Sequence, residues 1–584
     1  MTRERPDQAG KFKSFKDLRR SRGGPEPEAP AAPAAEGRPE ELVEKYGDAA
    51  LAETSRERIA ARPAAFGPMD HGPELYRDTD SEEMQLLASF RVRTVFPKDV
   101  LAELRTLPRD PDPADFAGRQ DLRNELIYTI DGEDAKDYDD AISIKDLGSG
   151  KVEIGVHIAD VAHYVVPGTA LDAEALARGT SVYLADQVVP MLPEELSNHL
   201  CSLVGGRPRL AYSVHMVFDA HGERLSARVG KSVIQSARRN TYKEVQELLD
   251  GQDTPGARAL KPLEDSLRLF QKWTVKQQQL RDQKGSMRIG SSEKKILFDE
   301  KHEVRAIVDA PRYFSMTLIE ETALAANQAV GDLFRARGLP TIYRVHPEKD
   351  PEEIEKVANA LEEHGLRVPK KERLTGRDIA RLIQAARKKP NAEALIQRIM
   401  GLVERAVYEV KDDKDVATHF GLARKAYLHF TSPIRRYPDL MVHRWLWAIE
   451  SRGAEAEREL KMEELVHDLT QVAAHCSMQA DVAEMAETAI YDLKICQYLH
   501  PHIGEKIEAV VVRVSPPGME VRLVPFNVTG FLPSRSIGEK AEVKGPNLLI
   551  RAGRRSLSFS EGHPIRVKIQ DVDFMRLSVL LELG

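Results

Sequence analysis

The segment at residues 131–140 carries the side chains with the clearest potential for chemistry. It reads Asp-Gly-Glu-Asp-Ala-Lys-Asp-Tyr-Asp-Asp, which places five aspartates within ten residues: Asp131, Asp134, Asp137, Asp139 and Asp140. Because carboxylates repel one another, a folded protein keeps them close only where a cation neutralises them. Hard oxygen ligands suit Mg²⁺ or Mn²⁺, and such ions activate water and stabilise displacement at phosphorus. The segment therefore predicts metal-dependent, nuclease-like chemistry.

Two other interpretations of this acidic segment exist. A calcium-binding loop starting at Asp131 needs glycine at its sixth position and glutamate at its twelfth. The sequence has Lys136 and Ile142 there, so the segment is not such a loop. A solvated acidic turn remains open, because acid-rich turns are common.

A second candidate segment runs from Tyr427 to Leu440 and contains Ser432-Pro433-Ile434-Arg435-Arg436. Ser-Pro directly before a helical pattern predicts a helix N-terminus, which favours anions. Arg435 and Arg436 could clamp a phosphate there and offset charge in the transition state. The alternative is an ordinary helix start with surface arginines.

A third candidate is Tyr183, in the segment Arg178-Gly179-Thr180-Ser181-Val182-Tyr183. An exposed tyrosine on such a turn could stack on a nucleic-acid base. A tyrosine that lies in the core or is half-buried is the competing interpretation, and nothing nearby in the sequence excludes it.

The elements that must position these residues predict an α+β fold. Strand-like runs at 125–130 and 152–158 flank the acidic segment, and Gly148-Ser149-Gly150 predicts a hairpin turn. From 312 to 500 the apolar spacing is helical, most clearly at 314–334, 375–410 and 440–499. Short strands separated by glycine turns in the last eighty or so residues predict a small β-barrel.

The expected division of the chain follows from these patterns. Residues 1–84 are expected to be a low-complexity, largely disordered tail with a basic opening, and 85–118 a short ordered lead-in. A catalytic domain with a sheet flanked by helices is expected at 119–500, and the barrel at 503–584.

Composition limits the class of protein. The 584 residues carry a net charge of −7, with 42% hydrophobic and 30% charged residues, as in an ordinary globular enzyme. This total disfavours a protein that coats nucleic acid in bulk but allows a local basic channel. The three cysteines form no CxxC pair, which argues against a disulfide framework or a thiolate zinc site. With no membrane-length apolar run and no signal-like N-terminus, we expect a cytoplasmic monomer.

Several of these segments together resemble the ribonuclease II / ribonuclease R (RNB) family. The resemblance covers roughly residues 90–500 and rests on the motifs listed in chain order as follows: 129–141, 157–161, 178–183, 191–198 and 429–437. The terminal barrel is similar to the OB-fold that closes these enzymes. The resemblance implies a processive, hydrolytic exoribonuclease that works 3′ to 5′ and releases nucleoside 5′-monophosphates. Its implied partner is single-stranded RNA with a free 3′ end.

The resemblance also implies roles for individual residues. Asp131, Asp137, Asp139 and Asp140 correspond to the four aspartates of an Mg²⁺ (or Mn²⁺) site, and Asp139 to the one whose amide replacement stops turnover but spares binding. The remaining correspondences concern substrate contacts: Arg435 to the phosphate, Tyr183 to the terminal base, and Tyr242 and Glu487 to the last nucleotides. Arg436 is expected to bind substrate from its place beside Arg435. Glu320 or Glu321 is expected to contribute, and the sequence does not choose between them.

The sequence departs from the family pattern at three places. The polar tail leaves no room for the two cold-shock OB-folds that usually precede the catalytic domain, so RNA capture is expected to depend on the C-terminal barrel or the basic arm. Ile289 stands where relatives often have a base-clamping phenylalanine, which leaves the end-product length open. The chain also ends without the lysine-rich tail of some relatives.

Two alternatives to the exoribonuclease remain. A catalytically impaired RNA-binding regulator with the same fold is one, since the missing cold-shock modules and Ile289 favour it. A hydrolase of cyclic dinucleotides or DNA is the other, because it would use the same metals. The intact aspartates and Arg435 favour the enzyme, because a binding protein has no need of a repulsive cluster.

Overall fold

The computed structural model of the chain describes residues 81–286, 294–300, 303–371, 374–389, 392–411, 418–419, 421–538, 540–544 and 547–584. The predicted disordered tail lies almost entirely outside these residues. Helix α4 (Ser81–Ser89) begins within its expected last residues, so regular structure starts earlier than the boundary at 84. None of the described helices is both long and apolar enough to cross a membrane.

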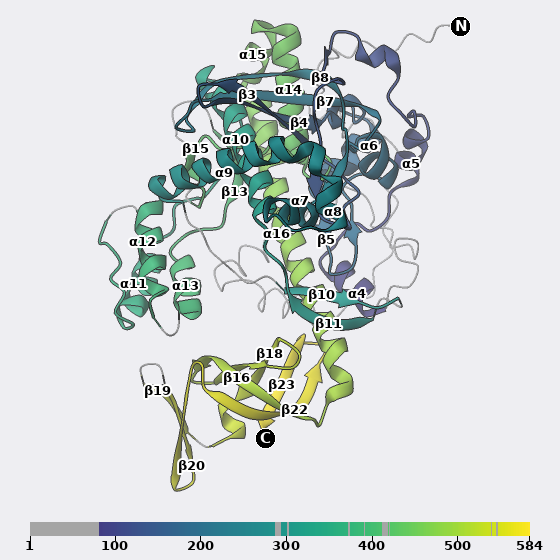
Figure 1. Ribbon diagram of the computed structural model, residues 1–584. Coiled ribbons are helices and arrows are strands. Elements are labelled where there is room, and N and C mark those ends of the chain that lie inside the picture. The colour runs from purple at the N-terminus through teal and green to yellow at the C-terminus, as the bar shows by residue number, and fades with distance from the viewer. Residues whose placement is uncertain are drawn as a thin grey trace.

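A five-stranded sheet forms the centre of the main body (Figure 1). Its strands, in spatial order, are β1 (Gln120–Asp121), β8 (Arg224–Gln235), β7 (Pro208–Phe218), β4 (Lys151–Ala159) and β3 (Asp140–Gly148). All neighbours are antiparallel except β1 and β8. The predicted hairpin at 148–150 is confirmed, because Gly148, Ser149 and Gly150 turn with positive φ between β3 and β4. The acidic segment ends where β3 begins.

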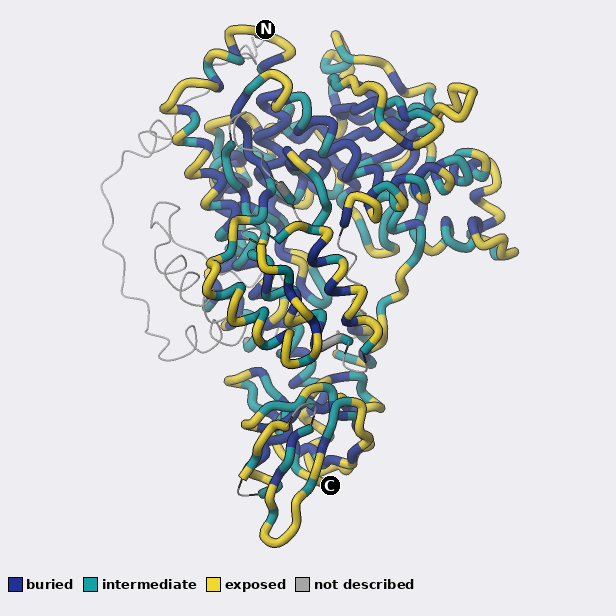
Figure 2. The backbone as a smooth tube through the Cα atoms, turned by 90° about the vertical axis from the view of Figure 1, so that its left-hand side faces the viewer, coloured by how far each residue is buried: buried dark blue, intermediate teal, exposed yellow. Residues whose placement is uncertain are grey.

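Long helices make up much of the main body, and the second candidate segment leads into the third of them. They are α9 (Glu264–Lys284), α10 (Phe314–Ala336), α14 (Tyr437–Arg452) and α16 (Glu463–Leu499). Buried side chains from the sheet and from these helices form one continuous core, which Figure 2 shows as the dark region of the upper body. Helix α16 has 37 residues and runs down to the C-terminal domain (Figure 1).

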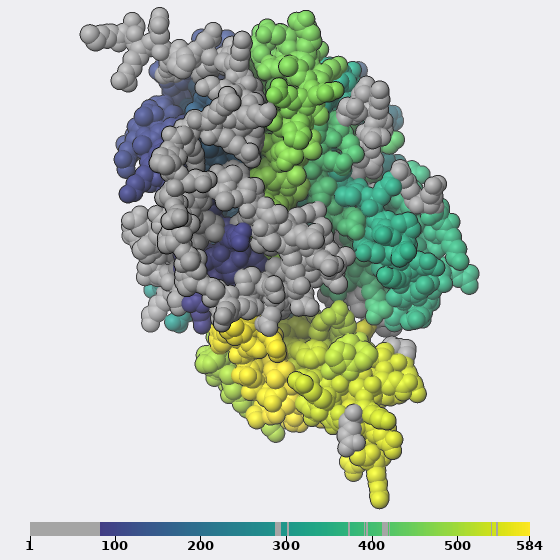
Figure 3. Space-filling view, turned by 180° about the vertical axis from the view of Figure 1, so that it is seen from behind, coloured from purple at the N-terminus to yellow at the C-terminus, as the bar shows by residue number. Residues whose placement is uncertain are grey.

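The predicted C-terminal barrel is confirmed. Its closed sheet contains β16 (Lys506–Ser515), β17 (Gly518–Leu523), β18 (Val528–Pro533), β23 (Ser578–Leu583) and β22 (Pro564–Asp573). A separate three-stranded sheet, β19 (Lys540–Lys544), β20 (Asn547–Ala552) and β21 (Arg555–Ser560), projects from it between β18 and β22. Figure 3 shows this sheet as a narrow extension at the end of the molecule.

The helical pattern expected over 312–500 is confirmed for most of that range, but strands and breaks interrupt it. Strands β12 (Thr341–Val345) and β13 (Val407–Lys411) pair with each other inside this range. Between them lie α11 (Pro351–Glu362), α12 (Gly376–Ala386) and α13 (Ala392–Met400), which form a lobe with a small core of its own. The predicted helix at 440–499 is three helices, because α14 ends at Gly453 with φ +55° and α15 (Ala454–Leu460) follows. The strand-like run at 125–130 contributes only β2 (Thr129–Asp131).

Gly331 permits a close approach of backbone to helix α10. A Cβ built on Gly331 would stand 2.0 Å from the carbonyl oxygen of Ala426, directly before the second candidate segment. Downstream of that contact, Asn327 of α10 accepts from the Phe430 amide (2.8 Å). Because Gly331 has no side chain, helix α10 can lie this close to residues 426–430.

We expect Gly331→Ala to destabilise the protein by about 1–3 kcal/mol, although alanine is the better helix former, because the new methyl group overpacks the contact. Urea denaturation measures this loss. Gly230→Ala on β8 is the control, since a Cβ there meets nothing within 4 Å. Equal stability of the two variants would contradict the close approach.

Candidate active site

The acidic segment is held by its backbone rather than by its carboxylates. The Tyr138 amide donates to Ser202 Oγ (2.9 Å), and Ser202 Oγ donates to the Lys136 carbonyl (2.8 Å). The Asp139 carbonyl accepts from the amide of Ala159, at the end of β4 (2.9 Å). These contacts fix the course of the segment from β2 to β3 and leave the carboxylates free to point into the site.

Asp139 lies at the centre of the site and meets the second candidate segment. Its Oδ1 accepts from the Ile434 amide (2.9 Å), from a residue 295 positions away. Its Oδ2 lies 3.6 Å from Arg435 Nε and has no hydrogen-bond partner in the described part of the chain. Asp139 is 5% exposed, whereas Arg435 is 42% exposed. One oxygen of a buried carboxylate is thus fixed while the other remains available beside a solvent-facing guanidinium.

Burial and mutual repulsion make the ionised aspartates unfavourable. Burial raises the pKa of Asp139 well above its ordinary value, against the opposing charge of Arg435. Burial also raises the pKa of Asp140 to about 6. Burial and the charges of Asp140 and Asp137 raise the pKa of Asp131 to about 8, and its Oδ2 is buried without a hydrogen bond. A cluster in this state favours a bound cation.

Arg239 holds the other end of the acidic segment, and no motif in the sequence pointed to this residue. It lies on β9 (Arg239–Thr241), which pairs in parallel with β2. Its guanidinium donates to the carbonyls of Gly132 (3.0 Å) and Glu133 and lies 5.5 Å from the ring centre of Tyr138. Its charge opposes the rise in the pKa of Asp131. Only the pairing of two distant strands brings it there.

Tyr183 joins the same site from the third candidate segment. Its hydroxyl donates to Asp137 Oδ2 (3.3 Å), and its amide donates to Glu487 Oε1 on α16 (2.7 Å). Tyr183 is 39% exposed, which excludes a core position and agrees with a half-buried one. Tyr183, Asp137 and Glu487 lie together as a group.

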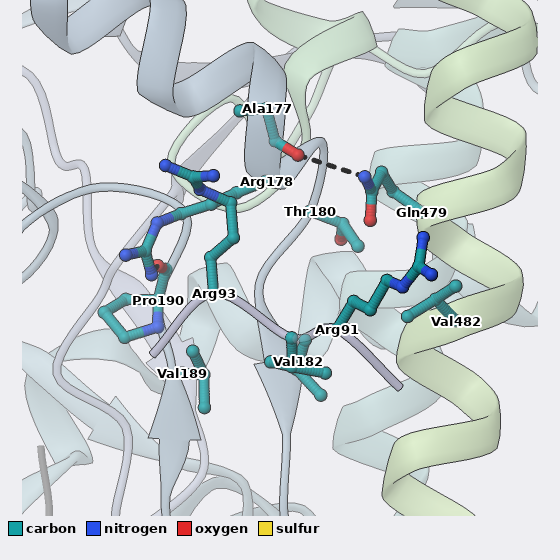
Figure 4. Close-up of a pocket in the computed structure, with 11 residues that line it drawn as sticks. Arg91, Arg93, Ala177, Arg178, Thr180, Val182, Val189, Pro190, Gln479 and Val482 are labelled. Carbon is teal, nitrogen blue, oxygen red and sulfur yellow. Dashed lines mark hydrogen bonds between the residues drawn. The ribbon is translucent and has the colours of Figure 1, made fainter. Parts of the chain in front are cut away.

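The segment that carries Tyr183 is fastened to that of Arg435. The Arg435 carbonyl accepts from the Ser181 amide (3.0 Å), and the Gly179 carbonyl accepts from the Tyr437 amide (3.0 Å). A pocket next to the segment that carries Tyr183 is lined in part by Arg93, Arg178 and Gln479 (Figure 4). There Arg93 and Arg178 share the carboxylate of Glu174, and Gln479 donates to the Ala177 carbonyl (3.0 Å).

Arg435 and Arg436 have different environments. Arg436 donates through Nε and Nη2 to the buried carboxylate of Asp439, with both distances 2.9 Å. Asp439 also accepts from the Ser432 amide (2.8 Å), so a turn precedes the helix. The expectation of a helix N-terminus at Ser432-Pro433 is wrong, because α14 begins at Tyr437. Arg435 is the arginine that remains available to a phosphate.

The other predicted residues lie at different depths. Tyr242 is the first residue of helix α7 (Tyr242–Leu249). Burial and, to a smaller extent, the negative charges of Asp140 and Asp131 raise the pKa of its hydroxyl. Tyr242 therefore lies beside the aspartates. Glu320 and Glu321 both pair with Arg281 (3.0 and 3.1 Å); Glu321 is fully buried and Glu320 is 43% exposed. No described contact joins either glutamate to the aspartates. Ile289 lies outside the described residues.

The fit of a metal ion rests on the free carboxylate oxygens. Among the described residues, no three His, Cys, Asp or Glu side chains are placed so as to hold one ion together. Mg²⁺ is commonly bound by one or two carboxylates, with water and substrate phosphate completing its shell. The unpaired oxygens of Asp131 and Asp139 suit that mode, so the residues fit a metal that is completed by substrate.

Comparison with known families and curated proteins agrees with this geometry. The RNB domain family matches residues 119–452, and the S1 RNA binding domain family matches residues 500–583. Ribonuclease R of Thermotoga maritima is 37% identical over 82% of this chain and 67% of its own length. Ribonuclease R of Escherichia coli is 31% identical over 85% of this chain. The chain spans 61% of the length of that relative.

Solved structures share the fold. Mycoplasma genitalium RNase R in complex with ribose-methylated single-stranded RNA superposes with a TM-score of 0.75 at 24% identity, over 86% of this chain and 78% of that one. Yeast Ssd1, described as a pseudonuclease, superposes with a TM-score of 0.63 at 17% identity, over 82% of this chain and 58% of that one. With the RNB match over more than half its length, the chain belongs to the ribonuclease II / ribonuclease R (RNB) family.

Proposed function

We propose that the chain is a hydrolytic, metal-dependent 3′-to-5′ exoribonuclease that degrades single-stranded RNA processively to nucleoside 5′-monophosphates. The observation that carries this proposal is the pair formed by Asp139 and Arg435. One oxygen of a buried carboxylate is fixed by the Ile434 amide, and the other is free next to an exposed guanidinium. That arrangement offers a ligand for a cation and a donor for phosphate at one place.

The roles of the surrounding residues follow from their positions. Arg435 can donate to the scissile phosphate and offset the charge that develops on it. Tyr183 offers a half-exposed ring to the terminal base, and its hydroxyl is held by Asp137. Glu487 fixes the Tyr183 backbone. Contacts to the phosphate and stacking on a base tolerate any sequence, as progressive degradation requires.

The metal in this proposal is Mg²⁺ or Mn²⁺, which one or two of the carboxylates of Asp131, Asp137, Asp139 and Asp140 would hold together with water and substrate phosphate. When bound, it supplies an activated water and stabilises charge at the displaced oxygen. The protein residues place the phosphate and keep the acidic segment in position. Because substrate phosphate would complete the coordination shell of the cation, we expect bound RNA to raise the affinity for the metal, and bound metal to raise the affinity for RNA.

A catalytically impaired RNA-binding regulator is the second candidate function. The observation that favours it is the similarity in fold to yeast Ssd1, described as a pseudonuclease. The fold alone therefore does not decide between catalysis and binding. The two functions differ in what becomes of a bound RNA.

Asp139→Asn is expected to lower RNA hydrolysis by at least about 100-fold while RNA binding persists, because an amide is a poorer ligand for a hard cation. A gel assay on 5′-labelled single-stranded RNA with a free 3′ end measures this. Wild type should give a short 5′ end product without intermediates, and EDTA or replacement of RNA by DNA should abolish it. Wild type that binds RNA but leaves it intact with either metal would establish the regulator.

Arg435→Lys and Arg436→Lys are expected to fail in different ways. The first removes a planar donor facing solvent, so turnover should fall by about 100-fold with normal stability. The second disturbs a buried bidentate pair with Asp439 and should lower stability by about 2–4 kcal/mol. Steady-state kinetics and urea denaturation separate the two effects. If the Arg436→Lys protein were stable but inactive while the Arg435→Lys protein stayed active, Arg436 rather than Arg435 would be the arginine that contacts the phosphate.

The metal-free protein should lose stability as pH rises from about 5 to about 8. The pKa of Asp131 is raised from 3.8 to about 8 and that of Asp140 to about 6, so these carboxyls ionise more readily after unfolding. Their protonation stabilises the folded state at low pH, and this contribution is lost through that window. Thermal melts in EDTA test it. Addition of Mg²⁺ should reduce the loss of stability with rising pH, and so should the Asp131→Asn substitution in EDTA. Identical curves of melting temperature against pH with and without Mg²⁺ would contradict this prediction.

A further inference from the structure

The projecting sheet of strands β19, β20 and β21 has two unlike faces. In an antiparallel sheet, residues opposite one another share a face. Leu548, Ile550 and Phe559 lie on the inner face and belong to the barrel core. On the other face, Lys540 and Ser556 both stand opposite Arg551, and all three are exposed. One face therefore attaches the sheet, and a polar face is left to solvent.

Positive charge is concentrated on this sheet. Residues 540–560 contain five cations (Lys540, Lys544, Arg551, Arg554 and Arg555) and one acid, Glu542, in a chain whose net charge is −7. Glu542 pairs with Lys544 (3.4 Å). Within the described part of the chain, the other four cations have no ion pair, and all four are exposed. The tip of the β20–β21 hairpin, residues 551–555, thus carries three arginines without an ion pair among the described residues.

The barrel wall differs from the projecting sheet in this respect. Its strands carry as many acids as cations, and three of their five cations pair with acids on neighbouring strands: Arg513 with Glu520, Arg566 with Glu508, and Lys568 with Glu582. Lys506 and Arg522 are exposed without an ion pair among the described residues, but the equal number of acids leaves the wall without an excess of positive charge. The contrast within one domain indicates that the charge on the sheet is available to an external anion.

We propose that this sheet is a second RNA-contacting surface, which binds the phosphates of a strand outside the barrel through Lys540, Arg551, Arg554 and Arg555. Arginine, lysine and serine side chains are the usual donors to phosphate oxygens. OB-folds bind oligonucleotides mainly on their second and third strands and adjacent loops. The projecting sheet follows the third barrel strand, β18, and therefore extends beyond that surface. The inference rests on the proposed RNA substrate but not on its hydrolysis.

The test uses full-length Asp139→Asn protein, so that RNA stays intact, and fluorescence anisotropy with two single strands. One has about 30 nucleotides, enough for more than one OB-fold site, and the other has about 6. Replacing Arg551, Arg554 and Arg555 together by serine should weaken binding of the long strand by roughly tenfold at low salt. The slope of log affinity against log salt should fall by about 2, because about 0.7 is lost per phosphate contact. Binding of the short strand should not change.

The matched control removes three exposed cations elsewhere, by replacing Lys356, Arg381 and Lys388 of the helical lobe with serine. This control should leave the affinity for both RNA strands and the salt dependence of binding unchanged. Replacing the three tip arginines by lysine should restore binding, because charge rather than shape is required. Unchanged long-strand binding in the serine variant, or an equal loss in the control, overturns the inference. Absence of RNA binding by the parent protein overturns the proposed function as well.

Discussion

The mutual repulsion of the carboxylates between Asp131 and Asp140 is the constraint on which the remaining structure depends. Raised pKa values at Asp131, Asp139 and Asp140 show that the folded protein holds these groups where their ionised forms are unfavourable. Such an arrangement persists only when neighbouring structure fixes it. The fixing contacts are the hydrogen bond from the Tyr138 amide to Ser202 Oγ and the one that the Asp139 carboxylate accepts from the Ile434 amide, so groups outside the cluster hold the aspartates in place.

Three arginines near the aspartates show how burial decides what a cation does. Arg436 lies in a bidentate pair with buried Asp439 and stabilises the turn before α14. Arg239 binds backbone carbonyls and fastens the acidic segment. Arg435 keeps one contact to Ser432 Oγ and leaves much of its guanidinium exposed. The neighbours in sequence, Arg435 and Arg436, are thus the least alike in environment.

Local patterns predicted much of the fold and the core of the site. The glycine turn at 148–150, the long helix from Phe314, the barrel and the aspartates depend on residues close in sequence, which spacing can show. Features that join distant segments could not be predicted. Strands β12 and β13 pair across the helical lobe, and Arg239 reaches the site through pairing of β9 with β2. The start of α14 was missed because the Asp439 side chain captures the Ser432 amide.

The net charge of −7 and a polyanionic substrate are compatible because charge is distributed unevenly. At the site, burial excludes water and makes one arginine beside a carboxylate effective, so few cations are needed. On the barrel wall, cross-strand pairs cancel part of the positive charge. On the projecting sheet, five cations accompany a single acid, Glu542, so positive charge is in local excess. Local placement, rather than the total, therefore determines where an RNA strand can be held.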